Sequence, residues 1–361
     1  MDFEREIDDL LPKYRLLTAS IESIIKNLIE QNNIDYLSIS GRTKNKEGIL
    51  EKIKRKNYKN PKTQITDISG VRVILFVESD IKLVSDIIEG SFVVDRLNSS
   101  NKDENLSLNQ VGYRSVHFVC DLGEQRSTLP EFQGLENLKF EIQIRTVLQH
   151  AWAEMAHDRS YKFRGQLPSN IQRRLYLHAG LLEIADKGFS ELATEIDDYT
   201  RSVNQSYEAG NLDIEINSIS LTEFIQNWAE KNNYPLEDAS ENVNAQVSEL
   251  VVELAGFGIK TISQLSDLIP SRFVQKAKEL NFRTNIFGLV RNFMIIEDVE
   301  KIMNQKNVKW TFYDPNEDPD EIKLLRDLST EENFVNIRRR IDEEMYEAED
   351  HEYAPDDDDF I

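Results

Sequence analysis

Cysteine and histidine are scarce in this chain of 361 residues. The single cysteine, Cys120, excludes an internal disulfide framework and a cysteine-based zinc site. The five histidines are too few for the several His and Asp ligands of a metal-dependent phosphohydrolase. No stretch approaches the roughly 20 apolar residues that a bilayer span needs, and the acidic start lacks a signal-peptide pattern. We therefore expect a cytoplasmic protein without a membrane segment.

Positive charge is also in short supply, and it is unevenly spread. Of the net charge of −22, residues 1–200 contribute −4 and residues 201–361 contribute −18, which predicts two functional halves. So acidic a chain argues against general DNA binding through a basic surface. Residues 42–62 are the exception, with nine basic side chains against two acidic ones. Such a basic window suits a compact polyanion such as a triphosphate.

Apolar spacing predicts an α+β fold for the first half of the chain. Residues 2–33 have helical spacing, with a turn expected at Pro12. A helical pattern returns from 146 to about 205. The strands expected between these helices are 36–40, 71–77, 92–95, 113–121 and 138–145. Strands separated by helices and polar loops indicate a mixed β-sheet flanked by helices, in a domain spanning 1–205.

The second half is expected to be mostly helical. Residues 206–342 form a predicted helical domain of unknown role, within which 256–269 has the pattern of a helix–turn–helix pair. Residues 343–361 are dominated by Asp and Glu, and we expect a disordered tail there. This half is open to three interpretations: a regulatory module, an oligomerisation domain, or a built-in inhibitor that covers the basic window.

Two segments carry residues suited to phosphate chemistry. Gly41-Arg42-Thr43-Lys44, followed by Lys52 and Lys56, supplies fixed cations that could hold a triphosphate. The alternative is a solvated basic helix face. Asp67 stands just before the strongest predicted strand, where a fixed carboxylate could bind Mg²⁺ together with phosphate oxygens. The alternative is that Asp67 caps a turn.

Alternation places further polar side chains on one face of two predicted strands. In 112–117 the side chains sharing a face are Tyr113, Ser115 and His117, and in 140–145 they are Glu141, Gln143 and Arg145. These polar faces indicate either a site or an ordinary solvent-facing sheet. The following predicted helix carries more candidates at spacings that bring side chains together: Trp152, Glu154, His157, Asp158, Tyr161 and Lys162.

Taken in order, these motifs resemble the synthetase domain of RelA/SpoT-type alarmone synthetases. The resemblance spans roughly residues 5–200, and we expect a synthetase-only protein, a small alarmone synthetase or a toxin-like relative, without the hydrolase domain of the long bifunctional members. The motifs are Gly41-Arg42-x-Lys44 with Lys52, Asp67-Ile-x-Gly70-x-Arg72, Gly112-Tyr113-x-Ser115-x-His117, Glu141-x-Gln143-Ile144-Arg145-Thr146, and Trp152-Ala153 with His157 and Tyr161-Lys162.

The resemblance implies a nucleotidyltransferase-like fold and a GTP/GDP pyrophosphokinase. ATP would donate pyrophosphate to the ribose 3′-hydroxyl of GDP or GTP, giving (p)ppGpp, with Mg²⁺ as cofactor. Asp67 and Glu141 would be catalytic and bind Mg²⁺, and Glu141 would help to deprotonate the 3′-hydroxyl. The implied ATP-binding residues are Arg42, Lys44, Lys52, Lys56 and Arg72. Tyr113 would stack on the acceptor base, in a pocket lined by Ser115, His117, Gln143, Arg145 and Lys162.

The sequence leaves other functions open. One alternative is a toxin-like pyrophosphokinase acting on the 3′ end of tRNA, with the C-terminal half as inhibitor or sensor. Another is a catalytically inactive module that senses guanine nucleotides, although the presence of Asp67 and Glu141 argues against it. A homo-oligomer is compatible with each of these functions.

Overall fold

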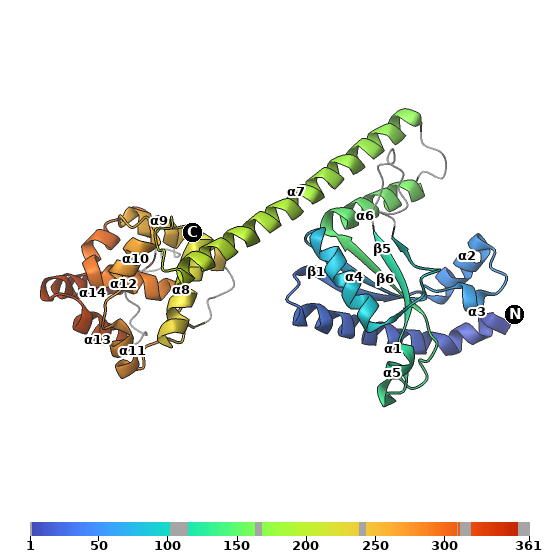
Figure 1. Cartoon of the computed structure of the whole chain (residues 1–361), viewed down its shortest axis with the longest axis horizontal. Helices are drawn as coiled ribbons and strands as arrows, with labels where there is room; N and C mark the ends of the chain where they lie inside the picture. The colour runs from blue at the N-terminus through green and yellow to red at the C-terminus, as the bar shows by residue number, and fades with distance from the viewer. Residues whose placement is uncertain are drawn as a thin grey trace, which may run out of the picture. The chain divides into compact units, whose positions relative to one another are not determined.

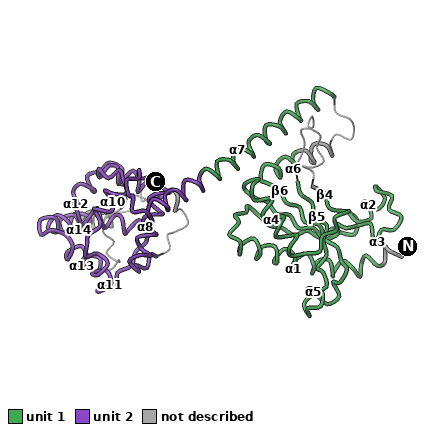
Figure 2. The backbone as a smooth tube through the Cα atoms, viewed as in Figure 1, with its two compact units in different colours: residues 1–195 green, residues 196–361 purple. Residues whose placement is uncertain are grey.

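The structure, a computed structural model, describes residues 2–101, 115–162, 168–237, 243–308, 310 and 319–352. The chain divides into two compact units, residues 1–195 and 196–361 (Figure 2). The long helix α7 (Ser169–Glu208) passes through both this division and the boundary expected at 205. Over the described residues, no helix has the length and apolar character that crossing a bilayer requires.

The first unit is built on a mixed sheet, as the sequence predicts. The strand order is β1-β2-β6-β5-β3, with β4 also paired to β5. The central pair, β2 and β6, is parallel, and the other pairs are antiparallel. The strands are β1 (Tyr36–Thr43), β2 (Ser69–Leu75), β3 (Val93–Val94), β4 (Ser100–Asn101), β5 (Val116–Asp121) and β6 (Phe140–Thr146). β1 extends into the predicted loop because Gly41 to Thr43 pair with Val71 to Ser69.

One face of this sheet forms the core of the unit. Helices α1 (Asp2–Gln31) and α4 (Ser79–Ser91) lie against the sheet (Figure 1). The apolar side chains that alternate along β2, β5 and β6 are buried together with those of these two helices. Residues such as Val73, Phe118 and Ile142 contribute to this cluster. The opposite face therefore carries the polar members of each strand.

Helix α1 corrects one expectation. Residues 2–31 form one helix that continues through Pro12, where a turn was predicted. Proline removes one backbone donor and costs roughly 3 kcal/mol inside a helix. Buried Ile7 and Leu11 before it and Tyr14 and Leu17 after it pack in the same core, and this burial outweighs the cost.

Short helices connect and flank these strands. They are α2 (Lys46–Lys56), α3 (Pro61–Gln64), α5 (Gly123–Ser127), the 3₁₀ turn η1 (Pro130–Phe132) and α6 (Val147–Lys162). Helix α7 is anchored to the first unit by two contacts. Buried Asp186 accepts a hydrogen bond from Thr146 at 2.6 Å, and the Ser190 hydroxyl accepts from the backbone N–H groups of Glu78 and Ser79 at 2.7 and 3.2 Å.

The second unit is helical in the part that the structure describes, as predicted. After α7 come α8 (Ser218–Asn232), α9 (Val243–Gly256), α10 (Ile262–Leu268), α11 (Phe273–Leu280), α12 (Ile286–Met303), α13 (Pro319–Leu328) and α14 (Glu331–Glu352). Helix α12 runs through its core, and most of its side chains from Ile286 to Val299 are buried. This unit has its own hydrophobic core, separate from that of the first.

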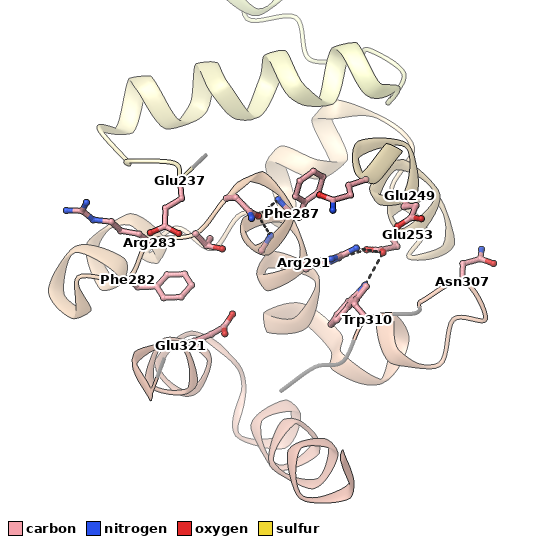
Figure 3. A pocket seen from close by; sticks show the side chains of 14 residues that line it. Glu237, Glu249, Glu253, Phe282, Arg283, Phe287, Arg291, Asn307, Trp310 and Glu321 are labelled. Carbon is pink, nitrogen blue, oxygen red and sulfur yellow. Dashed lines mark hydrogen bonds and ion pairs between the residues drawn. The ribbon is translucent and has the colours of Figure 1, made fainter. Parts of the chain in front are cut away.

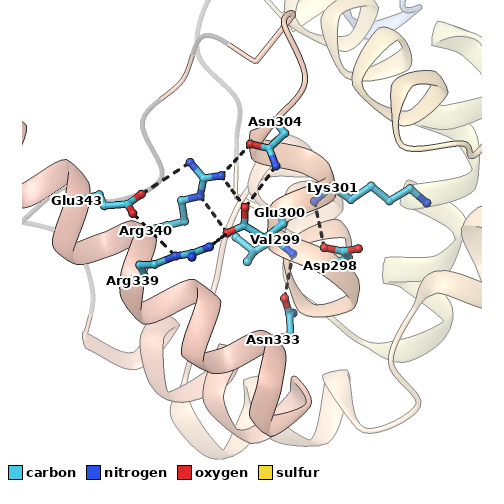
Figure 4. A network of polar contacts seen from close by, with 9 residues as sticks. All are labelled: Asp298, Val299, Glu300, Lys301, Asn304, Asn333, Arg339, Arg340 and Glu343. Carbon is cyan, nitrogen blue, oxygen red and sulfur yellow. Dashed lines mark hydrogen bonds and ion pairs between the residues drawn. The ribbon is translucent and has the colours of Figure 1, made fainter.

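Helix α12 is kinked at Asp298, which has non-helical dihedral angles (Figure 4). The buried Asn333 side chain supplies the hydrogen bonds that the kink removes: its Nδ2 donates to the carbonyl oxygens of Ile295 (2.8 Å) and Ile296 (2.9 Å), and its Oδ1 accepts from the N–H of Val299 (3.0 Å). A buried amide thus fixes the bend between the two halves of α12.

The C-terminal region corrects a second expectation. Helix α14 continues to Glu352, so residues 343–352 are helical although a disordered tail was predicted from 343. Ile341 is buried, and Arg339 and Arg340 pair with both Glu300 of α12 and Glu343 of α14 (Figure 4). Packing and these ion pairs extend the helix beyond what its acidic composition suggests. Residues 353–361 lie outside the described part of the chain.

Candidate active site

A cluster of two lysines and a carboxylate stands where β1 and β2 meet. Lys44 directly follows β1, and its backbone N–H donates to Ile68 at 2.8 Å, which aligns it with the chain before β2. Its Nζ lies 2.5 Å from Oδ2 of Asp67 and also donates to the Asp67 carbonyl oxygen at 2.9 Å. Lys52, from α2, reaches the same Oδ2 at 2.5 Å. The basic window and the predicted Asp67 are therefore joined directly.

Asp67 is held in its ionised form. Burial by itself would raise the pKa of this carboxyl group, but the hydrogen bonds and positive charges of Lys44 and Lys52 lower the pKa below its ordinary value. Only about a sixth of the side chain is exposed (16%). Its second oxygen, Oδ1, is buried and has no hydrogen-bond partner among the described residues.

A second chain of polar contacts crosses the sheet from β5 to β6. Nδ1 of His117 lies 2.8 Å from Oε1 of Glu141, and Gln143 Nε2 donates to Glu141 Oε2 at 3.0 Å. Arg145 then donates to Oε1 of Gln143 at 2.8 Å. The register explains the chain, because His117 is paired with Gln143 across the antiparallel strands and Glu141 is two residues away on the same face. The sequence predicted this shared face.

The two predicted catalytic carboxylates act on each other. Burial by itself raises the pKa of Glu141, but the hydrogen bond and charge of His117 and the hydrogen bond from Gln143 bring it below its ordinary value. The negative charge of Asp67 opposes this lowering, so the two carboxylates are close enough to interact electrostatically. Glu141 is partnered by Gly70 in the parallel pair β2–β6, three residues after Asp67.

Arg72 of β2 makes a further polar contact, with a residue of α6. It is partnered by Gln143 in the register of β2 and β6, and its guanidinium lies 3.1 Å from Glu154 of α6. His150 Nδ1 lies 3.7 Å from the same Glu154 carboxylate, one helical turn away. Burial, and then the charge of Arg72, lower the pKa of His150. Sequence reasoning did not assign His150 a role, although its four-residue spacing from Glu154 was a visible signal.

The remaining predicted residues are placed less centrally. Arg42 is exposed on β1, paired with Gly70, and Lys56 is exposed at the end of α2. Ser115 is buried, and its hydroxyl lacks a partner within the described part of the chain. Tyr113 lies outside the described residues. Lys162 ends α6, but its side chain, like those of His157, Asp158 and Tyr161, is not among those described.

A cavity of about 530 Å³ reaches His117 from the edge of the sheet. Its lining includes Ser100 of β4, Arg96, and Lys82 from α4. A volume of this order suits a nucleotide-sized ligand.

The donor set fits a magnesium ion better than a zinc ion. The described residues contain no cluster of three or more His, Cys, Asp or Glu side chains arranged to bind a metal. Two carboxylates that interact electrostatically, one of them with the unpartnered oxygen Oδ1 of Asp67, match a cation that takes one or two protein carboxylates and completes its shell with phosphate oxygens and water.

The part of the chain that is similar to known proteins includes Asp67 and Glu141. Residues 41–166 match the family described as "Region found in RelA / SpoT proteins". The chain is 29% identical over 202 residues to the GTP pyrophosphokinase YjbM of Bacillus subtilis (strain 168), covering 54% of this chain and 91% of that protein. It is 30% identical over 183 residues to the GTP pyrophosphokinase YwaC of the same organism, covering 49% and 83%.

Among solved structures, the small alarmone synthetase 1 from Bacillus subtilis aligns with 54% of this chain and 98% of its own, at 24% identity and a TM-score of 0.45. The matched family region, 41–166, contains Asp67, Glu141 and the lysines that hold Asp67. On these sequence matches, the chain belongs to the RelA/SpoT family.

Proposed function

We propose that this chain is a pyrophosphokinase that transfers the β,γ-pyrophosphate of ATP to the ribose 3′-hydroxyl of GDP or GTP, producing (p)ppGpp. The carrying observation is that Asp67, bound by two lysines just before β2, is close enough to the His117-bound Glu141 of β6 for its charge to raise the pKa of Glu141. Its matched relatives are GTP pyrophosphokinases, which supports the reaction class.

Donor binding is assigned to the basic side of this face. Lys44 and Lys52 are positioned by Asp67 to neutralise phosphate charge, and Arg72 of β2, held by Glu154, is the third cation assigned to the donor. Exposed Arg42 and Lys56 extend the positive surface along β1 and α2. The planar guanidinium of Arg42 suits stacking on adenine.

Acceptor binding is assigned to the β5–β6 side. The cavity that reaches His117 would hold the guanine nucleotide. Ser115, Gln143 and Arg145 are kept as acceptor-binding residues on the family resemblance, and Gln143 and Arg145 are linked to Glu141 by hydrogen bonds. Tyr113 and Lys162 are retained in the proposal as acceptor-binding residues on the family resemblance.

Glu141 is assigned the role of receiving the proton of the 3′-hydroxyl. Its lowered pKa keeps it ionised at neutral pH, and His117 and Gln143 fix its two oxygens. The 3′-oxygen then forms a bond to the β-phosphorus of ATP while the bond from that phosphorus to the oxygen bridging it to the α-phosphorus breaks, and AMP leaves. The side chains contribute alignment and charge neutralisation, which dominate phosphoryl transfer.

Mg²⁺ completes the proposal, held by Asp67 through Oδ1 and by Glu141. When bound, it would offset charge on the phosphates and make the acceptor hydroxyl more acidic. Asp67 is suited to this role because the two lysines engage only Oδ2 and leave Oδ1 available.

The reaction is tested by incubating the full chain with ATP labelled at the γ-phosphate, Mg²⁺, and one acceptor at a time: GDP, GTP, an adenine nucleotide or bulk tRNA. We expect label on the guanine nucleotide and equimolar AMP, and loss of at least 1,000-fold in rate for Glu141→Gln, since removing both a base and a charge costs several kcal/mol. Asp35→Asn, an exposed carboxylate outside the site, is the matched control.

The acceptors separate the alternatives. Label on tRNA alone would replace the proposal with a toxin-like activity, and label on adenine nucleotides alone would reassign the acceptor pocket. Nucleotide binding without any labelled product would identify a guanine-nucleotide sensor.

A further inference from the structure

Helix α7 has a second apolar face, opposite the one that contacts the first unit. On the contacting face, buried Asp186 accepts a hydrogen bond from Thr146, and Ala179, two turns earlier, is also buried. Successive residues are ~100° apart around a helix, so the positions nearly half a turn away from Ala179 and Asp186 lie on the opposite face. These positions form the α7 stripe, which consists of Leu177, Leu181, Ile184, Gly188 and Leu192.

The α7 stripe is exposed to solvent. Leu177, Leu181, Ile184 and Leu192 are 58%, 63%, 70% and 50% exposed. Gly188 carries no side chain, and a Cβ built on it would meet no atom within 4 Å. From residue 177 to residue 192, at a rise of ~1.5 Å per residue, the stripe is about 22 Å long. Contiguous apolar surface of this kind in a soluble chain marks a surface that binds another protein.

A charge of opposite sign stands at each end of the stripe. Arg174 precedes its first leucine by three residues, and Glu195 follows its last leucine by three, so both continue the same helix face. Both side chains are exposed, and neither has an ion-pair partner in the described part of the chain. Arg291, by contrast, is paired within the chain with Glu253 at 2.7 Å (Figure 3). The charges that end the stripe are therefore available to a partner.

From this arrangement we propose that the α7 stripe is a dimer interface, on which a second copy of this chain packs its own stripe in antiparallel orientation. Turned end to end, the stripe is complementary to itself. Leu177 lies beside the second copy's Leu192, and Leu181 lies over the second copy's Gly188, where the missing side chain leaves room. A two-fold axis repeats each of these contacts, as an interface between identical surfaces requires.

The end charges select the antiparallel orientation. It places Arg174 opposite the second copy's Glu195 at both ends of the stripe, whereas parallel packing would place like charges together. The whole of α7 has the same polarity: before Gly188 it carries three basic and two acidic residues, and after Gly188 one basic and five acidic residues. An apolar row between ends of opposite charge suits a second copy of α7 better than a polyanion.

The test is sedimentation velocity of the full chain over a wide range of concentration, and we expect a reversible monomer–dimer equilibrium. Leu181→Glu should weaken dimerisation at least about tenfold, because it buries a charge at the interface. The single chain should stay folded, since Leu181 is exposed within it, and circular dichroism checks this. Val335→Glu, at a comparably exposed apolar position of α14 (66%), is the matched control and should leave the Kd unchanged.

Charge reversal tests the orientation. Arg174→Glu and Glu195→Arg should each weaken the dimer about five- to tenfold, because each variant replaces two attractive pairs with two repulsive ones. The double variant should return the Kd to within about twofold of the wild-type value, which parallel packing does not predict. The proposal is overturned if the full chain is monomeric at every concentration, if Leu181→Glu dimerises as tightly as the wild type, or if the double variant is no tighter than the single ones.

Discussion

Replacing Asn333 with alanine should lower the free energy of unfolding of the second unit by more than the loss of one small side chain would suggest. The side chain makes three hydrogen bonds to backbone groups at the α12 kink, at 2.8, 2.9 and 3.0 Å, and it is 6% exposed. Asn333→Ala leaves two carbonyl oxygens and one N–H buried without partners. At about 1–3 kcal/mol for each such group, and with some relaxation of the kink, we expect a loss of roughly 3–4 kcal/mol. That is a large fraction of an ordinary domain's stability.

The assay is urea unfolding of the full chain followed by tryptophan fluorescence. Trp228 packs edge-on against Phe293 of α12 with ring centres 5.8 Å apart, so it reports on the second unit. Asn336→Ala, also on α14 but without a described kink contact, is the matched control and should change stability by less than about 0.5 kcal/mol. Equal shifts of the unfolding midpoint in the two variants would refute the role given to Asn333.

Three further perturbations test other parts of the structure. Lys52→Ala should lower kcat/KM on the order of 100-fold, since one of two cations on Asp67 is lost; the exposed Lys54→Ala should stay within about twofold, and equal losses would contradict the assignment. Gly41→Ala places a methyl carbon 2.5 Å from Oε2 of Glu22 and 2.7 Å from Cγ2 of Thr18, both on α1. This should cost about 1–3 kcal/mol in chemical denaturation, whereas an unchanged midpoint would show that these two side chains can move aside. Hydrogen bonds from two arginines lower the pKa of Glu300 from 4.5 to about 2, so its stabilisation is present above pH 4.5 and lost as the pH falls toward 2. Allowing for solvent screening, the gap between wild type and Glu300→Gln should shrink by roughly 1–2 kcal/mol between pH 7 and pH 2.5, and a constant gap would argue against the ion pairs.

The sequence predicted the sheet of the first unit because polar and apolar residues alternate along some of its strands and others are continuously apolar. The strand at 71–77 and the polar and apolar positions of 140–145 were recognisable from residue type alone. The parallel pairing of β2 with β6 was not, because it joins segments 71 residues apart and depends on how helices cover one face. Pro12 misled the prediction because local propensity was outweighed by the burial of α1.

Strand alternation predicted which candidate side chains share a face of the sheet, and it predicted only some of the contacts between them. Strand alternation grouped Glu141 with Gln143 and Arg145, but the bond from His117 to Glu141 requires the register of β5 against β6. The pairing of Arg72 with Glu154 joins a strand to a helix 82 residues away, and no local pattern encodes it. The periodicity of the sequence thus identifies which side chains share one face of a strand. Which of them bond to one another depends on how strands and helices pair in the folded chain.

The proposed function gives these pairings a consequence for substrate binding. Three of the proposed donor-binding cations are held by carboxylates: Lys44 and Lys52 by Asp67, and Arg72 by Glu154. These pairs order long side chains in advance and so reduce the entropy lost when phosphate binds. Phosphate must displace the carboxylates, however, and a ligand bringing only negative charge would leave the largely buried Asp67 without a cation. If a triphosphate arrived with its own divalent cation, Asp67 would hold the cation while Lys44 and Lys52 would hold the phosphates, so neither partner would be left unpaired. On the proposed function, the resting ion pairs would therefore favour a metal-bound nucleotide over a free polyanion.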